Sequence, residues 1–209
     1  MADLTQGEEL QAVEQRVADD PALSLLVNNA GFGGYMPFVA LDLDRAEELI
    51  RLQVLAVTRL TRAVLPGMIS RGHGAIINVS SRLAWSAALP SPPLPKRAIY
   101  AASKAYINAF TQLLHDELQG TGVQVQALCP GVVRTEFHAQ MGMDVERLPA
   151  VALTTPEAVV EASLAGLRLG EVICVPTLDD PALLRQVDAS QRQVLEHSMS
   201  GSIAERYAP

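Results

Sequence analysis

The sequence of 209 residues is poor in several residue types, and these shortages exclude classes of protein. Its two cysteines, Cys129 and Cys174, lie far apart in apolar stretches and match no zinc, redox or disulfide spacing, so no metal site is expected. We interpret them as small buried hydrophobic residues of a cytoplasmic protein. With a net charge of -7 and no run of lysine or arginine, the chain has no basic patch for nucleic acid or an anionic membrane.

Targeting signals are also lacking. The first twenty residues are polar and acidic, without the basic start and apolar core of a signal peptide. No uninterrupted apolar run approaches the length that spans a bilayer, so no membrane association is expected. With 49% hydrophobic residues, the chain has the composition of one globular domain over residues 1–209.

Strands and helices alternate along the chain. Runs rich in valine, isoleucine and leucine predict strands at residues 23–28, 75–80, 123–129 and 171–176. Helices are predicted at residues 44–69, 98–119, 156–169 and 181–196, the third between Thr155 as N-cap and Gly170 just after its end. This order indicates an α/β fold, a doubly wound parallel sheet with helices on both faces. A proline-rich loop at 83–98 and a C-terminal helix and tail at 180–209 complete the organisation.

The unusual residues follow the predicted strands. "NNAGFGG" (28–34), "SS" (80–81) and "PGVVRTE" (130–136) come after the first three strands, and ligands bind at this rim of open parallel sheets. Gly31, Gly33 and Gly131 would let the backbone approach a ligand or adopt a positive φ; plain turns explain them equally well taken singly.

Tyr100 and Lys104 form a pair four residues apart on the second predicted helix. The chain has only two lysines against fourteen arginines, so a lysine here is notable. Residues four apart share a helix face, and an ammonium can lower the pKa of a nearby phenol and donate to a ribose hydroxyl. On spacing alone, an incidental pair on an exposed face remains open.

In this order and on these elements, "NNAG", "INVSS", "YAASK" and "CPGVVRT" make residues 3–176 resemble a short-chain dehydrogenase/reductase. The resemblance implies a Rossmann-like fold and an NAD(P)-dependent oxidoreductase that interconverts an alcohol and a carbonyl. It implies that Tyr100 is the general acid or base, that Ser81 orients the substrate oxygen, and that Lys104 binds the nicotinamide ribose and lowers the pKa of Tyr100.

The same resemblance implies a cofactor site. Besides Tyr100 and Lys104, its residues would be Asp3 (adenine), Asn28, Ala30 and Gly31 (cofactor lining and central sheet), and Pro130, Gly131, Val133 and Thr135 (nicotinamide). An N-cap for the following helix explains Asp3 equally well. The family also implies a homo-oligomer, a dimer or tetramer, built on its two long helices; NAD against NADP stays undetermined.

Three departures from the family pattern matter. Gln53 stands where an asparagine usually bends the helix and anchors a water in a proton relay, so we expect the relay to be weakened or rebuilt. The loop at 83–98 lengthens the gap between Ser81 and Tyr100; it bulges at the site mouth or is a plain surface insertion. The third departure is the absence of the family's opening strand, glycine-rich TGxxxGxG turn and next two strands.

This absence has two consequences. Cofactor affinity should fall steeply without the turn, and the strand at 23–28 should present an open apolar edge, leaving the chain unstable, aggregation-prone or dependent on a partner.

We interpret the sequence as an enzyme that is truncated or mis-started at its N-terminus, or else as a degenerate product. The alternative function is a non-catalytic interaction module. A hydrolase using Ser81 is disfavoured because no GxSxG turn is present and no motif places a histidine as its base.

Overall fold

The computed structural model describes residues 1–92, 94–139, 153–199 and 201–207. The chain divides into two compact units, Met1–Pro176 and Thr177–Pro209. The second unit contains helix α7 (Ala182–Ser198) and a short 3₁₀ helix, Glu205–Tyr207. All the predicted site residues lie in the first unit.

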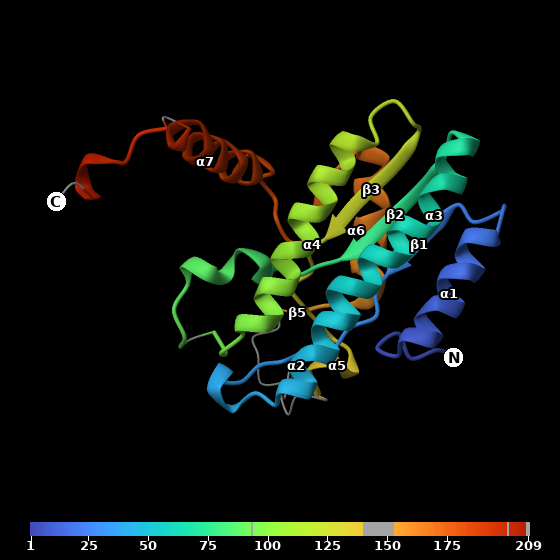
Figure 1. Cartoon of the computed structure of the whole chain (residues 1–209), viewed down its shortest axis with the longest axis horizontal. Coiled ribbons are helices and arrows are strands. Elements are labelled where there is room, and N and C mark those ends of the chain that lie inside the picture. The colour runs from blue at the N-terminus through green and yellow to red at the C-terminus, as the bar shows by residue number, and fades with distance from the viewer. Residues whose placement is uncertain (93, 140–152, 200, 208–209) are drawn as a thin grey trace. The chain divides into compact units, whose positions relative to one another are not determined.

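The first unit is built on a parallel sheet of four strands in the order β1-β2-β3-β6 (Figure 1). The strands are β1 (Leu25–Asn28), β2 (Gly74–Val79), β3 (Val123–Leu128) and β6 (Ile173–Cys174). Leu26 pairs with Ile76, and Ile76 pairs with Val125, so the buried centres of the first three strands align. The predicted α/β class with a parallel sheet is confirmed, although the last strand is only two residues long.

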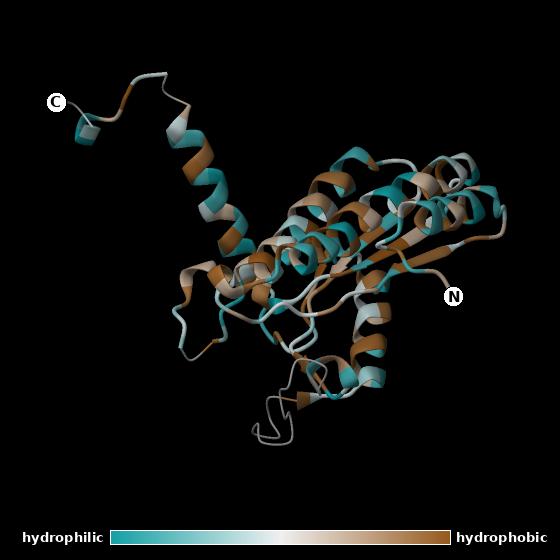
Figure 2. Ribbon diagram, turned by 60° about the horizontal axis from the view of Figure 1, so that its bottom comes forward, coloured by the Kyte–Doolittle hydropathy of each residue, from teal (hydrophilic) through white to brown (hydrophobic). Residues whose placement is uncertain are grey.

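Helices cover both faces of this sheet because adjacent strand residues point in opposite directions. Ile76 packs with residues of α3 (Val57–Arg71) and α4 (Ala98–Glu117), whereas its neighbour Ile77 packs with Val159 and Leu167 of α6 (Pro156–Leu169). Figure 2 shows hydrophobic residues along the strands and on the helices around them. These two clusters form the core that holds the strand ends in place.

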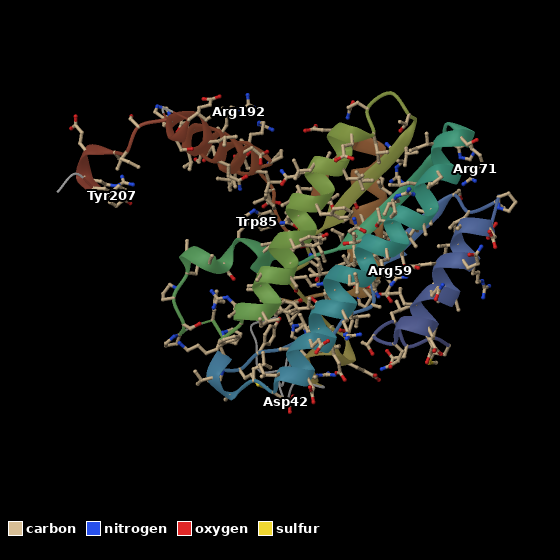
Figure 3. All side chains as sticks on the ribbon, in the orientation of Figure 1. Asp42, Arg59, Arg71, Trp85, Arg192 and Tyr207 are labelled. Atoms are coloured by element: carbon tan, nitrogen blue, oxygen red, sulfur yellow. The ribbon has the colours of Figure 1, made fainter. Side chains whose placement is uncertain are left out.

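The helix that the sequence analysis placed after Asp3, without bounds, is α1 (Gly7–Asp19). Its apolar side, with Leu10 buried, packs against Ala56 and Leu60 of the neighbouring helices. Glu14 of α1 also forms a two-pronged ion pair with Arg59 of α3, with Arg59 Nη2 2.6 Å from Glu14 Oε2. Figure 3 labels Arg59 on α3. The first helix is therefore tied to the main unit by both packing and charge.

The helix predicted at 44–69 is one continuous helical stretch with an irregular centre. It consists of α2 (Leu43–Ile50), a π-helical segment, Arg51–Ala56, and α3. By length and composition alone, its 29 residues, with a mean hydropathy of 1.2 in the best window, could cross a membrane. The expectation from the sequence concerned uninterrupted apolar runs, so it stays a prediction. Since 44% of that window is buried inside the protein, and core helices pass the same test, the indication is weak.

Strand β1 is an edge of the sheet, because among the residues that the structure describes it pairs only with β2. Leu25 is 38% exposed and Val27 47% exposed, although the strand is apolar. Such an edge offers unpaired backbone groups to another strand. The open edge expected from the sequence is thus present in the described part of the chain.

The proline-rich loop contains a 3₁₀ helix, Arg82–Ala88, and is held by one buried side chain. The guanidinium of Arg97 donates five hydrogen bonds of 2.6 to 3.0 Å to loop oxygens: Ser86 O and Oγ, Leu89 O, Ser91 Oγ and Pro95 O.

The remaining short elements are the 3₁₀ helix Phe38–Ala40, β4 (Val132–Val133), α5 (Glu136–Ala139) and β5 (Leu153–Thr154), with β4 and β5 paired in parallel.

Candidate active site

Three predicted catalytic residues meet near the carboxyl end of β2. Ser81 follows this strand and starts the 3₁₀ helix of the proline-rich loop, where its Oγ accepts a hydrogen bond of 3.1 Å from Leu83 N. Tyr100 lies in the first turn of α4, and Lys104 lies one turn later on the same face. Because the end of a strand and the start of a helix meet here, residues far apart in sequence converge.

The phenol of Tyr100 is buried, with 5% of the residue exposed. Burial raises its pKa, while hydrogen bonds from the hydroxyls of Ser81 and Tyr35 lower it. The Tyr35 ring meets the Tyr100 ring edge-on, with centroids 5.1 Å apart, and the Phe137 ring lies at 6.2 Å. A phenol in these surroundings keeps its proton at neutral pH and has two hydroxyl partners for its oxygen.

Lys104 is also buried, and its Nζ donates a hydrogen bond of 2.8 Å to Val79 O at the end of β2. Burial lowers its pKa from 10.5 to about 8, an effect that the nearby Cys129 thiol partly opposes. Nζ lies 5.6 Å from the centroid of the Tyr100 ring. The expected effect of Lys104 on the pKa of Tyr100 stays a prediction, since the causes resolved here are burial and the two hydroxyls.

Gln53 lies in the π-helical segment with 1% of its surface exposed. Its Nε2 donates to Phe32 O at 2.5 Å, and its Oε1 accepts from Ser103 Oγ at 2.9 Å. The side chain therefore joins the loop after β1 to helix α4 directly. The expected water relay is untested, but both ends of the amide have protein partners.

Asn28 ends β1 and connects the central strands. Its Nδ2 lies 2.8 Å from Asn78 Oδ1 and 3.2 Å from Thr61 Oγ1, and Asn78 Nδ2 donates to Thr111 Oγ1 at 3.1 Å. This buried chain of polar groups links β1 and β2 to α3 and α4. Asn28 therefore stabilises the central sheet, as the family resemblance implied. Its contact with a cofactor stays a prediction.

The segment after β3 lies against the start of the proline-rich loop. Pro130 O accepts a hydrogen bond of 3.1 Å from Arg82 N, and a Cβ added to Gly131 would lie 3.3 Å from Arg82 Nη1. Val133 pairs with Thr154 of β5, and Thr135 Oγ1 accepts from Phe137 N at 3.4 Å. The Arg82 side chain therefore lies against Gly131, which the family resemblance assigned to the nicotinamide site.

Of the two roles expected for Gly31, Gly33 and Gly131, a positive φ is wrong, and close approach to a ligand stays a prediction. The positive-φ glycines in the described residues are Gly72, Gly74, Gly120, Gly122, Gly170 and Gly201, which do not include Gly31, Gly33 or Gly131. At Gly31 the relevant property is closeness, because an added Cβ would lie 3.4 Å from Gln53 Nε2. Ala30 precedes it in the loop after β1.

Asp3 does not cap helix α1, whose N-cap is Gln6. Its Oδ1 instead accepts hydrogen bonds from Thr5 N (2.9 Å) and Thr5 Oγ1 (2.7 Å), which lower the pKa of the Asp3 carboxyl. The alternative role as an N-cap is wrong in this detail, since the aspartate closes a local turn before the helix. Contact with an adenine ring stays a prediction.

Two residues of the site were missed in the sequence: Tyr35, which contacts Tyr100, and Arg97, which holds the loop between Ser81 and Tyr100. Both lie in irregular segments, where no periodicity places a side chain. In the described ranges, no three His, Cys, Asp or Glu side chains gather as a metal site would require. The site therefore consists of hydroxyls, an ammonium and amides around one buried phenol.

A parallel α/β sheet with a serine, tyrosine and lysine at its rim defines a Rossmann-type nucleotide-binding class of fold. Residues 1–146 match the sequence model of the family described as short chain dehydrogenase. The chain belongs to the short-chain dehydrogenase/reductase family.

Among solved structures, a short-chain dehydrogenase from Sphingobium yanoikuyae in complex with NADPH is similar, with a TM-score of 0.89 and 32% identity, over 99% of this chain and 78% of that one. The bulky-bulky ketone specific alcohol dehydrogenase from Comamonas testosteroni has a TM-score of 0.86 and 30% identity, over 100% of this chain and 77% of that one.

Among curated proteins, the very-long-chain 3-oxoacyl-CoA reductase of Mus musculus is 42% identical over 119 residues, which are 55% of this chain and 36% of that protein. Across eight of the curated relatives that it matches, this chain spans from 36% to 56% of their length.

Proposed function

We propose that this protein is an NAD(P)-dependent oxidoreductase that interconverts a small-molecule alcohol and a carbonyl, with Tyr100 as general acid or base. The observation that carries the proposal is the convergence of the Ser81 hydroxyl, the Tyr100 phenol and the buried Lys104 ammonium at the rim of the sheet. The similarity to a dehydrogenase that binds NADPH supports it.

In the reducing direction, NAD(P)H would, when bound, supply the hydride that the carbonyl carbon receives. Tyr100 Oη gives its proton to the carbonyl oxygen, and the phenolate that remains accepts hydrogen bonds from Ser81 and Tyr35. Ser81 Oγ lies beside the same phenol and orients the substrate oxygen toward it. In the oxidising direction Tyr100 takes the proton of the alcohol.

The nicotinamide half of a cofactor fits the residues present. Lys104 has three N–H donors, and the described residues supply one acceptor, Val79 O, so two donors remain for ribose hydroxyls. Asn28, Ala30 and Gly31, with Pro130, Gly131, Val133 and Thr135, would line the ring and the carboxamide, and Asp3 would meet the adenine. The glycine-rich phosphate turn of the family does not occur in these 209 residues, so we expect weak affinity.

The test is the consumption of NADPH, and separately of NADH, by the purified chain with a panel of small and bulky ketones. Turnover that falls by at least about a hundredfold in Tyr100→Phe supports the proposal, since general acid catalysis contributes about that much or more. Tyr106→Phe is the control: its phenol lies on the same helix and bonds to Thr58 Oγ1 at 2.7 Å. If Tyr100→Phe consumes NADPH as fast as the control Tyr106→Phe, the assignment of Tyr100 is contradicted.

A second candidate is a non-catalytic module that pairs through the open edge of β1, and the exposed Leu25 and Val27 favour it. Obligate association with another protein, without saturable binding of NADPH or NADH, would support this candidate. Saturable cofactor binding by the isolated chain would exclude it as the sole function.

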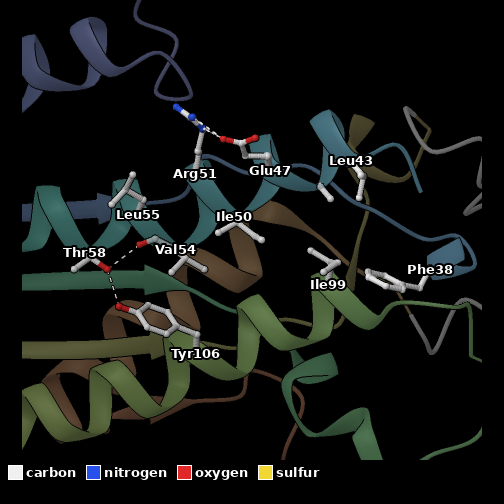
Figure 4. A pocket seen from close by; sticks show the side chains of 11 residues that line it. Phe38, Leu43, Glu47, Ile50, Arg51, Val54, Leu55, Thr58, Ile99 and Tyr106 are labelled. Atoms are coloured by element: carbon white, nitrogen blue, oxygen red, sulfur yellow. Dashed lines mark hydrogen bonds and ion pairs between the residues drawn. The ribbon is translucent and has the colours of Figure 1, made fainter. Parts of the chain in front are cut away.

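We further propose a cytoplasmic homo-oligomer. An open hollow of about 840 Å³ lies along the two long helical stretches and is lined largely by apolar side chains (Figure 4): Phe38, Leu43, Ala46, Glu47, Ile50, Arg51, Val54, Leu55, Thr58, Ile99 and Tyr106. Leu43 on the rim of this hollow is 79% exposed, and a second copy of the chain would cover it. Sedimentation at micromolar concentration tests this, and a monomer would contradict it.

A further inference from the structure

The proline-rich loop between Ser81 and Tyr100 is organised around one buried guanidinium. Arg97 is 9% exposed, and its five N–H donors bond to three carbonyl and two hydroxyl oxygens of the loop. None of these acceptors is charged, and no ion pair to Arg97 occurs among the residues that the structure describes. Because a buried arginine is costly unless its donors are bonded, a movement that opens the loop and breaks all five bonds at once is disfavoured.

Packing fixes the same loop near its start. The half-buried side chain of Trp85, on the 3₁₀ helix, packs against a buried cluster from α4 and the end of β3: Ile107, Ala127 and Cys129. Ser86 connects the two anchors, because its Oγ donates to Leu83 O at 2.7 Å and accepts from Arg97 Nε at 2.6 Å. The loop is therefore held by packing at one end and by a charged clamp at the other.

The two ends of this loop are the two residues proposed to meet the substrate oxygen. Ser81 directly precedes the 3₁₀ helix, and Tyr100 lies in the first turn of α4, whose N-cap is Arg97. Arg97 O also accepts a hydrogen bond of 2.8 Å from Ala101 N, so the clamp residue is part of the helix that carries the tyrosine. A substrate whose oxygen lies between Ser81 and Tyr100 is thus bordered by the loop that joins them.

The position of Ser81 does not depend on this clamp. Its two neighbours are bonded to residues that end and follow β3: Ser80 N to Leu128 O at 2.7 Å, and Arg82 N to Pro130 O at 3.1 Å. Loss of the Arg97 side chain should therefore loosen the loop without displacing the serine. This separates an effect on the fit of the substrate from an effect on the chemistry.

We propose that Arg97 is a positioning residue that holds the proline-rich loop as a fixed wall of the substrate site, and that this wall sets the size of the ketone that the site accepts. The inference rests on the proposed function and gives the loop a role in it. A lid that moves to admit each substrate needs a segment with few bonds to the rest of the fold, whereas this loop is bonded and packed at both ends.

The first measurement compares Arg97→Ala with the wild type in the absence of substrate. Acrylamide should quench the fluorescence of Trp85 about twofold more strongly in Arg97→Ala, because the loop loses its clamp. Millimolar guanidinium chloride should reverse this change by occupying the space of the lost side chain, and sodium chloride at the same concentration should not. The matched control is Arg71→Ala, which removes a half-buried arginine that donates to Leu23 O at 2.7 Å in the connection before β1 and should leave the quenching unchanged.

The second measurement is the consumption of NADPH with butanone as a small ketone and benzophenone as a bulky one. The wild type should discriminate between them, and Arg97→Ala should move the ratio of their kcat/KM values about tenfold toward one, chiefly through KM. Guanidinium chloride should restore the ratio. Unchanged quenching in a folded Arg97→Ala, or a ratio that stays within about twofold of the wild-type value, would overturn the proposal.

A third measurement needs neither a variant nor turnover. The backbone N–H groups of Leu83, Ala84 and Leu89 are hydrogen-bonded within the loop, so their hydrogen exchange in the wild type should be about a hundredfold slower than in an unstructured peptide. Exchange at the rate of an unstructured peptide would overturn the fixed wall, even if Arg97→Ala does not fold. A wild type that consumes no NADPH would instead contradict the proposed function, and with it the selection of ketones, while quenching and exchange still decide whether Arg97 fixes the loop.

Discussion

The burial of Lys104 predicts a stability that depends on pH. Its pKa is lowered from 10.5 to about 8 in the folded state, chiefly by burial. The unfolded chain then binds the proton more tightly than the folded chain, so the free energy of unfolding rises as the pH rises from 8 to 10.5. Below pH 8 the folded protein carries the full cost of the buried charge, and above 10.5 it carries none.

The magnitude follows from the gap between the two pKa values. About 2.5 pH units at about 1.4 kcal/mol each give about 3.5 kcal/mol. Lys104→Met keeps the length of the side chain but removes the charge, so its stability should lack this rise. Cys129, with its pKa raised to about 12 by burial, destabilises the fold above pH 9 in both proteins. The difference between the two curves therefore reports Lys104 together with its interaction with the Cys129 thiol.

The assay is urea unfolding at pH 7.5, 9 and 10.5, followed by the fluorescence of Trp85, the single tryptophan of the chain. The other lysine, Lys96, is exposed, so Lys96→Met is the matched control and should parallel the wild type. Parallel curves for wild type and Lys104→Met, within about 0.5 kcal/mol, would refute the reasoning, because the buried ammonium would then cost nothing.

Three other changes have definite expected outcomes. Gln53→Leu should lower the free energy of unfolding by about 1 to 3 kcal/mol in urea, since Phe32 O loses its hydrogen bond from the amide and Ser103 Oγ loses one of its two acceptors; a loss below about 0.5 kcal/mol would be inconsistent with this. Arg97→Lys should speed chymotrypsin cleavage in the loop at 83–96, because an ammonium cannot replace five fixed donors; equal cleavage rates would contradict this. Thr155→Ala should cost about 1 kcal/mol, measured by thermal unfolding, through the lost cap bond to Ala158 N; an unchanged midpoint would refute it.

The regular elements were predictable where local signals agree. Helix α6 has the predicted bounds, because Thr155 caps its first turn, Pro156 suits the first position and Gly170 adopts a left-handed φ of 73°. The first three strands were found to within two residues because parallel strands are apolar on both faces. Helix α1 was expected after Asp3 but without bounds, although Glu8 and Glu9 in its first turn and apolar residues at helical spacing could have given them.

The site was predictable only where motifs follow strands or share a helix face. Ser81, Tyr100 and Lys104 were assigned in this way, and the structure brings them together. The partners of these residues were not predictable: Tyr35 approaches Tyr100 from a loop, and Gln53 reaches Ser103 through a π-helical turn. Contacts of this kind depend on tertiary packing rather than on local sequence pattern.

Cofactor binding by this chain is the central expectation, and a fluorescence titration of the purified protein with NADPH, then NADH, tests it most directly. We predict saturable binding that is lost in Lys104→Met and retained in Lys96→Met, because the buried ammonium has two N–H donors left for the nicotinamide ribose. A folded protein that gives no saturable signal, or a Lys104→Met variant that binds as tightly as the wild type, would contradict the account.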